Sequence, residues 1–315
     1  MRDFSNAVRA ELARLRPGQR CCAWAELAGV LRAGGSLHLL GNKRFTLSIQ
    51  TEHADVARKI VVLLRSVAGL PAEVVVEEHV VLGRRRTYHV QPPADYETKR
   101  LLIELGILDA EGRLIGDLPS HLLQPECCRA SFLRGAYLMR GSVCDPRGNS
   151  YHLEIVASTE DFALGLCYLL NLARLKAHLA ERKQKQVVYL KDADDIAGFL
   201  SLVGANARRL EFEEVRVLKE VRGGVNRLVN AETANLDKSA AAAVEQIRLI
   251  EALQRRGALA DLPEPLRAVA EARLANPEAT LAELGRLLAP PLSKSAVNHR
   301  FRGLRDYARE ILGDA

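Results

Sequence analysis

Near its C-terminus, the sequence gathers side chains that can hydrogen-bond to a nucleic acid. Arginine and asparagine can bond base edges in the major groove through paired hydrogen bonds, whereas hydroxyls and lysine suit phosphate oxygens. Ser293 and Lys294 stand at the start of a predicted helix and are therefore placed for phosphate. The candidate DNA-binding residues are Ser293, Lys294, Ser295, Asn298, His299, Arg300, Arg302 and Arg305.

Three predicted helices position these residues. Asn276-Pro277 ends the first helix, the capping-box pair Thr280 and Glu283 opens the second, and Ser293 caps the third. The three helices are expected at 265–275, at 281–288 and from Ser293 to about Leu312.

The third helix is amphipathic. Its apolar residues recur every three or four positions and share one face, so that Ser295, His299 and Arg302 fall on the opposite face. The third of three helices, with one apolar face toward the core and one polar face toward solvent, fits the recognition helix of a helix-turn-helix. The alternative is a small helical bundle with a solvated polar face. The apolar residues are Val297, Phe301, Leu304, Ala308 and Ile311.

Two other stretches, 27–37 and 133–143, repeat one helical pattern with glycine at two shared positions. Small residues let two helices approach more closely than the usual ~8–10 Å. The last glycine is expected to end each helix in a conformation that other residues enter reluctantly. Strand-like alternation follows each copy, so the sequence predicts a duplicated α+β unit with a pseudo-twofold helix pair. The shared glycines are Gly29 and Gly35 in the first copy and Gly135 and Gly141 in the second.

The repeated frame resembles the LAGLIDADG motif of homing endonucleases, in which an acidic residue before the last glycine holds a catalytic divalent metal. Gly34 and Arg140 occupy those positions, and neither Glu26 nor Asp145 is near enough in sequence to replace the acid. Glycine offers no carboxylate, and arginine has the wrong charge for a magnesium site. We therefore expect no catalytic residue, no metal, no cofactor and no enzymatic activity. Arg134 and Arg140, near the pseudo-twofold, are the next candidates for DNA contact if the tail does not read DNA.

The predicted fold class is α+β: a duplicated LAGLIDADG-like αββ-type domain followed by an all-α helix-turn-helix domain. Gly223-Gly224 is expected to interrupt a polar helical connector. The predicted parts are an N-terminal helix at 1–20, the LAGLIDADG-like domain at 21–204 with halves 21–106 and 124–204, the connector at 205–260, and the helix-turn-helix domain at 261–315. Within them, helices are predicted at 3–15, 54–67, from 94, 159–172 and 193–203. Strands are predicted near 37–40, 45–49, 73–79, 87–90, 151–156, 175–179 and 186–190, with a turn at 41–43 and a tip at 83–86.

Charge and hydropathy favour an anionic partner and exclude a membrane span. The 315 residues carry a formal net charge of +6 and a sequence pI of about 9.1. No apolar run approaches the ~20 residues of a membrane helix, and the N-terminus lacks the apolar segment of a signal peptide. We expect a cytoplasmic, nucleoid-associated protein with no membrane partner.

The six cysteines include two adjacent pairs, Cys21-Cys22 and Cys127-Cys128, at matching offsets before the repeat helices. With Cys144 and Cys167, they form no CxxC motif. We interpret them as small buried hydrophobic residues; the alternative is a redox or metal-binding role.

Taken together, several stretches resemble the WhiA family of bacterial regulators, over nearly the whole chain and in the same order. The resemblance implies a degenerate LAGLIDADG domain joined to a C-terminal helix-turn-helix. It also implies a sequence-specific transcriptional regulator of sporulation, cell division or chromosome segregation, which binds promoter sites in double-stranded DNA and lacks nuclease activity. The stretches are 132–142, 151–155, 226–230, 234–238 and 290–300.

Two alternative functions remain open from the sequence. One is an active metal-dependent endonuclease, against which Gly34 and Arg140 argue. The other is a scaffold built on the nuclease fold that binds a small ligand or a protein, such as another transcription factor or a sigma factor.

Overall fold

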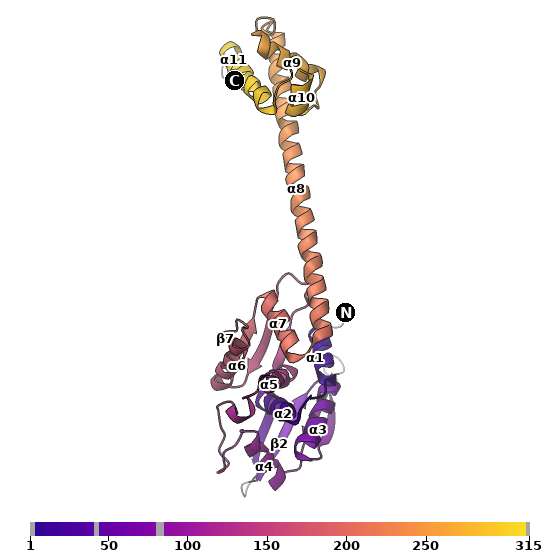
Figure 1. Cartoon of the computed structure of the whole chain (residues 1–315), viewed down its shortest axis with the longest axis vertical. Coiled ribbons are helices and arrows are strands. Elements are labelled where there is room, and N and C mark those ends of the chain that lie inside the picture. Colours follow the sequence, from indigo (N-terminus) through magenta and orange to yellow (C-terminus); the bar gives the residue numbers. More distant parts are fainter. Residues whose placement is uncertain (1–3, 41–43, 80–84, 313–315) are drawn as a thin grey trace. The chain divides into compact units, whose positions relative to one another are not determined.

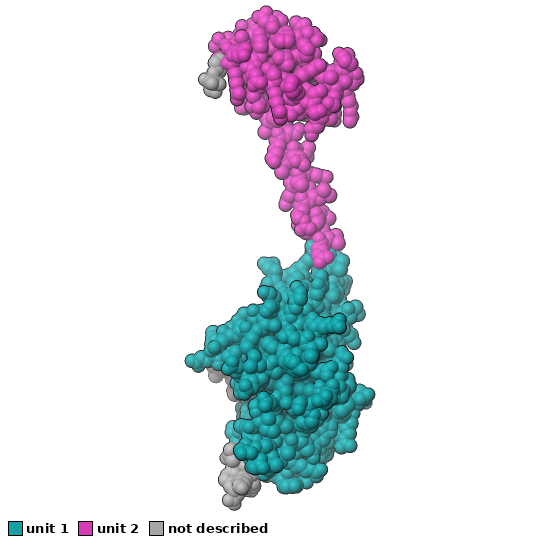
Figure 2. Space-filling model, turned by 60° about the vertical axis from the view of Figure 1, so that its left-hand side comes forward, with its two compact units in different colours: residues 1–219 teal, residues 220–315 magenta. Residues whose placement is uncertain are grey.

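The computed structural model describes residues 4–40, 44–79 and 85–312. The chain forms two compact units, Met1–Lys219 (unit 1) and Glu220–Ala315 (unit 2), coloured teal and magenta in Figure 2. Unit 1 combines helices with two antiparallel sheets and unit 2 is helical, which confirms the predicted fold class. No helix in the described part of the chain has the length and apolar character of a membrane span.

Unit 1 contains the same four-stranded antiparallel sheet twice. The strand order is β1-β2-β4-β3 in the first half and β5-β6-β8-β7 in the second, so equivalent strands hold equivalent places. This repeated order confirms the predicted duplication. The strands are β1 Gly35–Leu40, β2 Arg44–Thr51, β3 Glu73–His79, β4 Arg85–Gln91, β5 Gly141–Val143, β6 Leu153–Ala157, β7 His178–Arg182 and β8 Lys185–Leu190.

The helices of unit 1 cover the sheets, and α2 and α5 lie together inside it (Figure 1). Residues of α2 and α5 contribute a large part of the buried core of this unit. The helices are α1 Phe4–Arg14, α2 Arg20–Gly34, α3 Ala54–Ala68, α4 Tyr96–Glu104, the 3-10 turn η1 Ser120–Leu122, α5 Glu126–Arg140, α6 Glu160–Leu172 and α7 Ala193–Val203.

The two repeat helices touch through their backbones, as predicted. A Cβ atom added to Gly29 would lie 2.2 Å from the carbonyl oxygen of Phe132, and one added to Gly135 would lie 2.2 Å from that of Glu26. Glu26 and Phe132 each precede the glycine of their own helix by three residues. The contact is therefore reciprocal, which is what a pseudo-twofold pair requires.

The glycines at the helix ends behave differently from the prediction. Gly35 and Gly141 follow α2 and α5, but their φ angles of −77° and −81° are open to any residue. Crowding explains the glycines instead. A Cβ at Gly141 would lie 2.1 Å from the ring of Tyr137, and one at Gly35 would lie 2.6 Å from the carbonyl oxygen of Leu31.

Most predicted elements of unit 1 appear within a few residues of their predicted bounds, and α7 and β3 match them. The strand predicted at 175–179 instead begins at His178, because the chain first closes α6: Arg174 has a φ of 61°, and the Leu175 N–H donates to the Leu170 carbonyl at 3.0 Å. The turn predicted at 41–43 and the first part of the tip predicted at 83–86 lie outside the described residues.

The predicted interruption at Gly223-Gly224 is wrong, because α8 runs from Asn206 to Arg255 as one helix. Glycine in a helix costs roughly 1 kcal/mol relative to alanine, which lowers helix stability without forcing a break. A Cβ at Gly224 would meet no atom within 4 Å, so no close packing requires glycine there.

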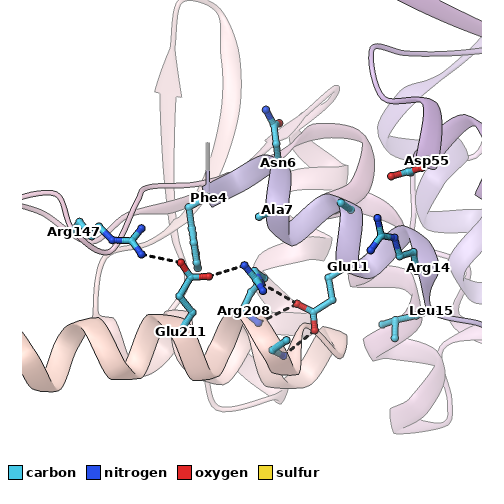
Figure 3. A pocket seen from close by; sticks show the side chains of 12 residues that line it. Phe4, Asn6, Ala7, Glu11, Arg14, Leu15, Asp55, Arg147, Arg208 and Glu211 are labelled. Atoms are coloured by element: carbon cyan, nitrogen blue, oxygen red, sulfur yellow. Dashed lines mark hydrogen bonds and ion pairs between the residues drawn. The ribbon is translucent and has the colours of Figure 1, made fainter. Parts of the chain in front are cut away.

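The start of α8 is fastened to α1 within unit 1 (Figure 3). The backbone N–H groups of Ala207 and Arg208 donate to the Glu11 carboxylate at 2.8 and 3.0 Å. Glu11 thereby satisfies N–H groups that a helix start leaves without partners. Arg208 also donates to Glu211 at 2.6 Å, and Arg147 donates to Glu211 at 3.1 Å.

Unit 2 packs three short helices against the last part of α8. Ile250 and Leu253 of α8 are fully buried in the same core as Val269 and Leu304. The last part of α8 therefore forms a fourth side of the core of the predicted three-helix tail. The short helices are α9 Glu264–Ala275, α10 Leu281–Leu287 and α11 Lys294–Leu312.

Candidate nucleic-acid interface

Helix α11 separates an apolar face from a polar one, as predicted. Four of its five predicted apolar residues are buried, while Ile311 near its end is 41% exposed. Asn298 and Arg302 lie four residues apart and are both exposed, so they are neighbours on the helix surface. The other predicted contacts that lie exposed are Ser293, Lys294, Ser295, His299 and Arg305.

The start of α11 is capped by the predicted residue. The backbone N–H of Ala296 donates to the Ser293 hydroxyl oxygen at 3.2 Å, and the Ser293 and Ser295 hydroxyls lie 2.9 Å apart. Capping leaves some N–H groups of the first turn directed outward, beside the exposed Lys294. A helix start with a lysine next to it is a suitable place for a phosphate group.

Helix α10 begins with the predicted capping box. Thr280 N–H donates to the Glu283 carboxylate at 2.8 Å, and Glu283 N–H donates to the Thr280 hydroxyl at 3.3 Å. The hydrogen bond from the Thr280 N–H lowers the pKa of Glu283 below its usual value. The box therefore sets where α10 begins.

The turn between α10 and α11 depends on Gly285. The Leu292 N–H donates to the Gly285 carbonyl at 2.8 Å. A Cβ at position 285 would lie 2.2 Å from the Leu292 carbonyl oxygen and 3.2 Å from Val297. A larger residue would push α11 away from α10 and change the direction of its polar face.

Arg273 is a structural residue of unit 2 that the sequence analysis missed. It is 2% exposed at the end of α9, and its guanidinium lies 5.7 Å from the ring centroid of Phe301 in α11. It donates to the side chain of Gln246 in α8 at 3.1 Å and to the Ala279 carbonyl at 2.6 Å. Burial lowers its pKa. Its spacing of four residues from the buried Val269 was the available signal, since this spacing puts both on one helix face.

Two of the predicted DNA-binding residues are less accessible for contact with DNA than the others. Arg300 is half-buried. Arg305 is exposed but lies 3.5 Å from the carboxylate of Glu245 in α8, as a surface ion pair. Such pairs contribute little to stability, typically 0–1 kcal/mol, so Arg305 can exchange this partner for another anion.

In unit 1, Glu26 is the centre of a buried ionic group. Its carboxylate lies 2.7 Å from the Lys59 ammonium of α3 and 3.0 Å from the Arg134 guanidinium of α5. Lys59 also donates to the carbonyls of Leu12 and Leu15, and its burial lowers its pKa. Arg134 was a candidate for DNA contact only if the tail does not read DNA. Because its side chain is only 11% exposed and engaged in this group, it is not placed for that contact.

The positions that carry acids in homing endonucleases have a different chemistry in this chain. A Cβ on Gly34 would lie 2.4 Å from the side chain of Met139, so α5 fills the space beside it. Arg140 is exposed, and its Nε donates to the Ala33 carbonyl at 3.2 Å. Glu26, in the middle of α2, is neutralised by two cations and is not directed to this end of the helices.

The cysteines correct another prediction. Cys22 and Cys128 are buried, but Cys21, Cys127 and Cys144 are exposed and therefore do not act as small core residues. Adjacent residues on a helix point about 100° apart, which explains why each pair has one buried and one exposed member.

Comparisons with known proteins agree across the chain. Family models described as the WhiA N-terminal LAGLIDADG-like domain, the WhiA LAGLIDADG-like domain and the WhiA C-terminal HTH domain match residues 20–108, 129–222 and 225–308. A protein named "Probable cell division protein WhiA" from Heliobacterium modesticaldum is 44% identical over 306 residues, which is 97% of this chain and 96% of that protein. One of the same name from Desulfitobacterium hafniense is 43% identical, over 98% of this chain and 96% of that protein.

A solved structure matches this chain over its full length. The crystal structure of full-length WhiA from Thermatoga maritima is 28% identical, with a TM-score of 0.61, and the match covers 100% of both chains. With three family models in sequence order and relatives above 40% identity over nearly the full length, the chain belongs to the WhiA family.

Proposed function

We propose that the protein is a sequence-specific DNA-binding regulator of transcription that acts in cell division, and in related processes such as sporulation or chromosome segregation. The observation that carries this proposal is the polar face of α11, where Asn298, His299 and Arg302 are exposed together above a buried apolar face. The family membership and the printed names of the relatives support the cellular role.

The residues of α11 divide the work of recognition. Arg302 and Asn298 lie within the helix, where they can reach base edges in the major groove, and Ser295 and His299 share this face. Ser293 and Lys294 at the helix start bind phosphate. Arg305 exchanges its ion pair with Glu245 for a contact with phosphate. The half-buried Arg300 contributes less to DNA binding than the exposed residues.

The partner is double-stranded DNA at promoter sites, which places the protein at the nucleoid. Unit 1 serves as a scaffold, a second DNA contact or a surface for another regulator such as a sigma factor. The exposed Arg140 is then its candidate DNA contact, since the mostly covered Arg134 side chain is engaged with Glu26.

The proposal is tested by mapping bound chromosomal sites in the source organism and measuring the affinity of the full chain for the strongest site. Arg302→Ala should lose about 1–3 kcal/mol of binding free energy and relax discrimination at one base position. Lys294→Ala should weaken all sequences about equally and lower the salt slope by about one contact.

Arg256→Ala is the matched control, because Arg256 is an exposed arginine of unit 2 that follows α8 and lies outside α11. Equal affinity of the full chain for mapped and scrambled sites would contradict sequence-specific reading. If Arg302→Ala and Asn298→Ala left specific binding unchanged, α11 would not be the reading element.

We further infer that the protein does not cleave DNA, because Gly34 and Arg140 stand where the nuclease acids would be. Supercoiled plasmid incubated with the full chain and Mg²⁺ should stay intact, with a homing endonuclease as the positive control. Mg²⁺-dependent cleavage that co-purifies with the protein, and that is lost in an Arg140 variant, would show that this inference is wrong.

A further inference from the structure

Cys21, Cys22, Cys127 and Cys128 form a cluster in unit 1, which we call the four-cysteine cluster. Their four Sγ atoms lie within 4.8 Å of one another. These residues are two adjacent pairs in the sequence, separated by more than a hundred positions. The cluster is therefore a product of the fold.

The parallel packing of α2 and α5 brings the two pairs together. Both pairs lie in the first turn of their helix, and at the other end of the same two helices Gly34 lies against Met139. Cys21 precedes Gly29 by eight residues, and Cys127 precedes Gly135 by eight. Since the helices meet at these glycines in matched register, equivalent cysteines meet as well.

The cluster lies where the backbone provides positive potential. Two helix N-termini meet there, and each contributes unsatisfied N–H groups and the positive end of a helix dipole.

The spacing of the sulfurs suits one tetrahedral metal ion. A Zn–S bond of about 2.3 Å gives sulfur–sulfur distances of about 3.8 Å in a tetrahedron. The four Sγ atoms are at most 4.8 Å apart. Each sulfur–sulfur distance therefore has to decrease by no more than ~1 Å to reach that geometry. The exposed Cys21 and Cys127 give a path from solvent, and the buried Cys22 and Cys128 close the inner side.

We propose that the four-cysteine cluster binds one Zn²⁺ ion as a closed structural site that joins the N-terminal ends of α2 and α5. Binding replaces the four thiol protons with one Zn²⁺, and no electron is transferred. Four thiolates complete the coordination shell, so the ion has no open position for substrate or water, unlike a catalytic zinc. Because α2 and α5 belong to different halves of unit 1, the ion connects the two halves.

The test uses the full chain, reduced, stripped with a chelator and titrated with Co²⁺ as a spectroscopic probe. One equivalent should give the intense ligand-field bands of a tetrahedral site and thiolate-to-metal charge transfer, and Zn²⁺ should displace it. Zn²⁺ should also raise the melting temperature of the protein, since it binds the folded state.

Cys21→Ser and Cys127→Ser are the informative variants, because both residues are exposed and their replacement leaves the core intact. Losing a residue that hydrogen-bonds to a metal ligand typically lowers metal affinity about 10–100-fold. Each variant loses a ligand itself, so its Zn²⁺ affinity should fall by more than that. The melting temperature of each variant in chelator should equal that of the metal-free parent, which separates metal binding from folding.

Cys144→Ser is the matched control, since Cys144 is an exposed cysteine outside the cluster, and it should bind metal as the parent does. The proposal is overturned if the reduced chain gives no thiolate charge transfer with Co²⁺, or if the Cys21 and Cys127 variants bind as tightly as the parent. It is also overturned if the cluster sulfurs are found paired as disulfides and the reduced protein takes up no metal.

Discussion

Gly29 and Gly135 are the residues at which the two halves of unit 1 meet without side chains between them. Gly29→Ala adds one carbon atom, which would lie 2.2 Å from a backbone oxygen that cannot rotate away. The helices must separate, so we expect the free energy of unfolding to fall by about 1–3 kcal/mol, as for other overpacked cores. Urea denaturation followed by circular dichroism measures this loss.

Gly224→Ala is the matched control for that substitution. Gly224 is also inside a helix, but a Cβ there would meet no atom within 4 Å. Helix propensity then predicts a neutral effect or a gain of up to about 1 kcal/mol in helix stability. Equal denaturation midpoints for Gly29→Ala and the parent protein would mean that α2 and α5 do not touch at Gly29.

At the scale of elements, Arg273 connects three helices of unit 2 and thereby sets the direction of α11. Arg273→Met keeps the bulk of the side chain but leaves the Gln246 side chain and the Ala279 carbonyl without this donor. Buried polar groups without partners cost about 1–3 kcal/mol each. We therefore expect the melting of unit 2 to shift down and specific DNA affinity to fall with it, while unit 1 melts unchanged.

Calorimetry of the full chain, combined with the DNA affinity assay, checks this prediction. Arg286→Met is the comparison, since Arg286 is an exposed arginine of α10 and its loss should not change the melting of unit 2. If Arg273→Met melted like the parent protein, the buried guanidinium would not hold the helices together.

At the scale of the whole molecule, α8 belongs to both compact units, and residues 225–241 in its middle are all exposed. Helix stability in proteins comes mostly from packing, so this stretch should open locally more often than either unit. Brief trypsin treatment should cut first at Arg222, Arg227 or Lys238 and leave one resistant fragment from each unit. Mass spectrometry identifies the cuts.

Replacing Gly223-Gly224 with two alanines should slow that cleavage, because it strengthens the helix and adds only one ordinary contact, between a Cβ at position 223 and the end of the Arg227 side chain at 3.4 Å. The same exposed lysine and arginine sites remain, so the substrate for trypsin does not change. First cuts inside α2, α5 or α11 would instead show that a unit is less stable than the exposed part of α8.

The features that could be predicted from the sequence are those determined by residues close together in the chain. The Thr280–Glu283 capping box and the Ser293 cap each span three residues, and they appear as predicted. The apolar period of α11 and the repeated small-residue frame also depend only on local spacing, which is why the helix-turn-helix and the duplicated unit were predicted.

The features that the sequence analysis missed depend on residues far apart in the chain. Glu26 meets Lys59 and Arg134 only when α2, α3 and α5 are packed, and nothing in its own neighbourhood indicates this. Arg273 shares a helix face with Val269, but the partners that enclose its guanidinium come from the distant α8 and α11.

The sequence by itself determined the fold class, the family resemblance and the polar face of α11, because helix caps, hydrophobic period and repeated motifs are local properties. Only the tertiary structure decided that Arg134 pairs with the buried Glu26 and that two distant cysteine pairs form one cluster. The physical reason is that parallel packing of α2 and α5 sets which side chains share a site. That packing depends on backbone contact at Gly29 and Gly135, which no single stretch of the chain specifies.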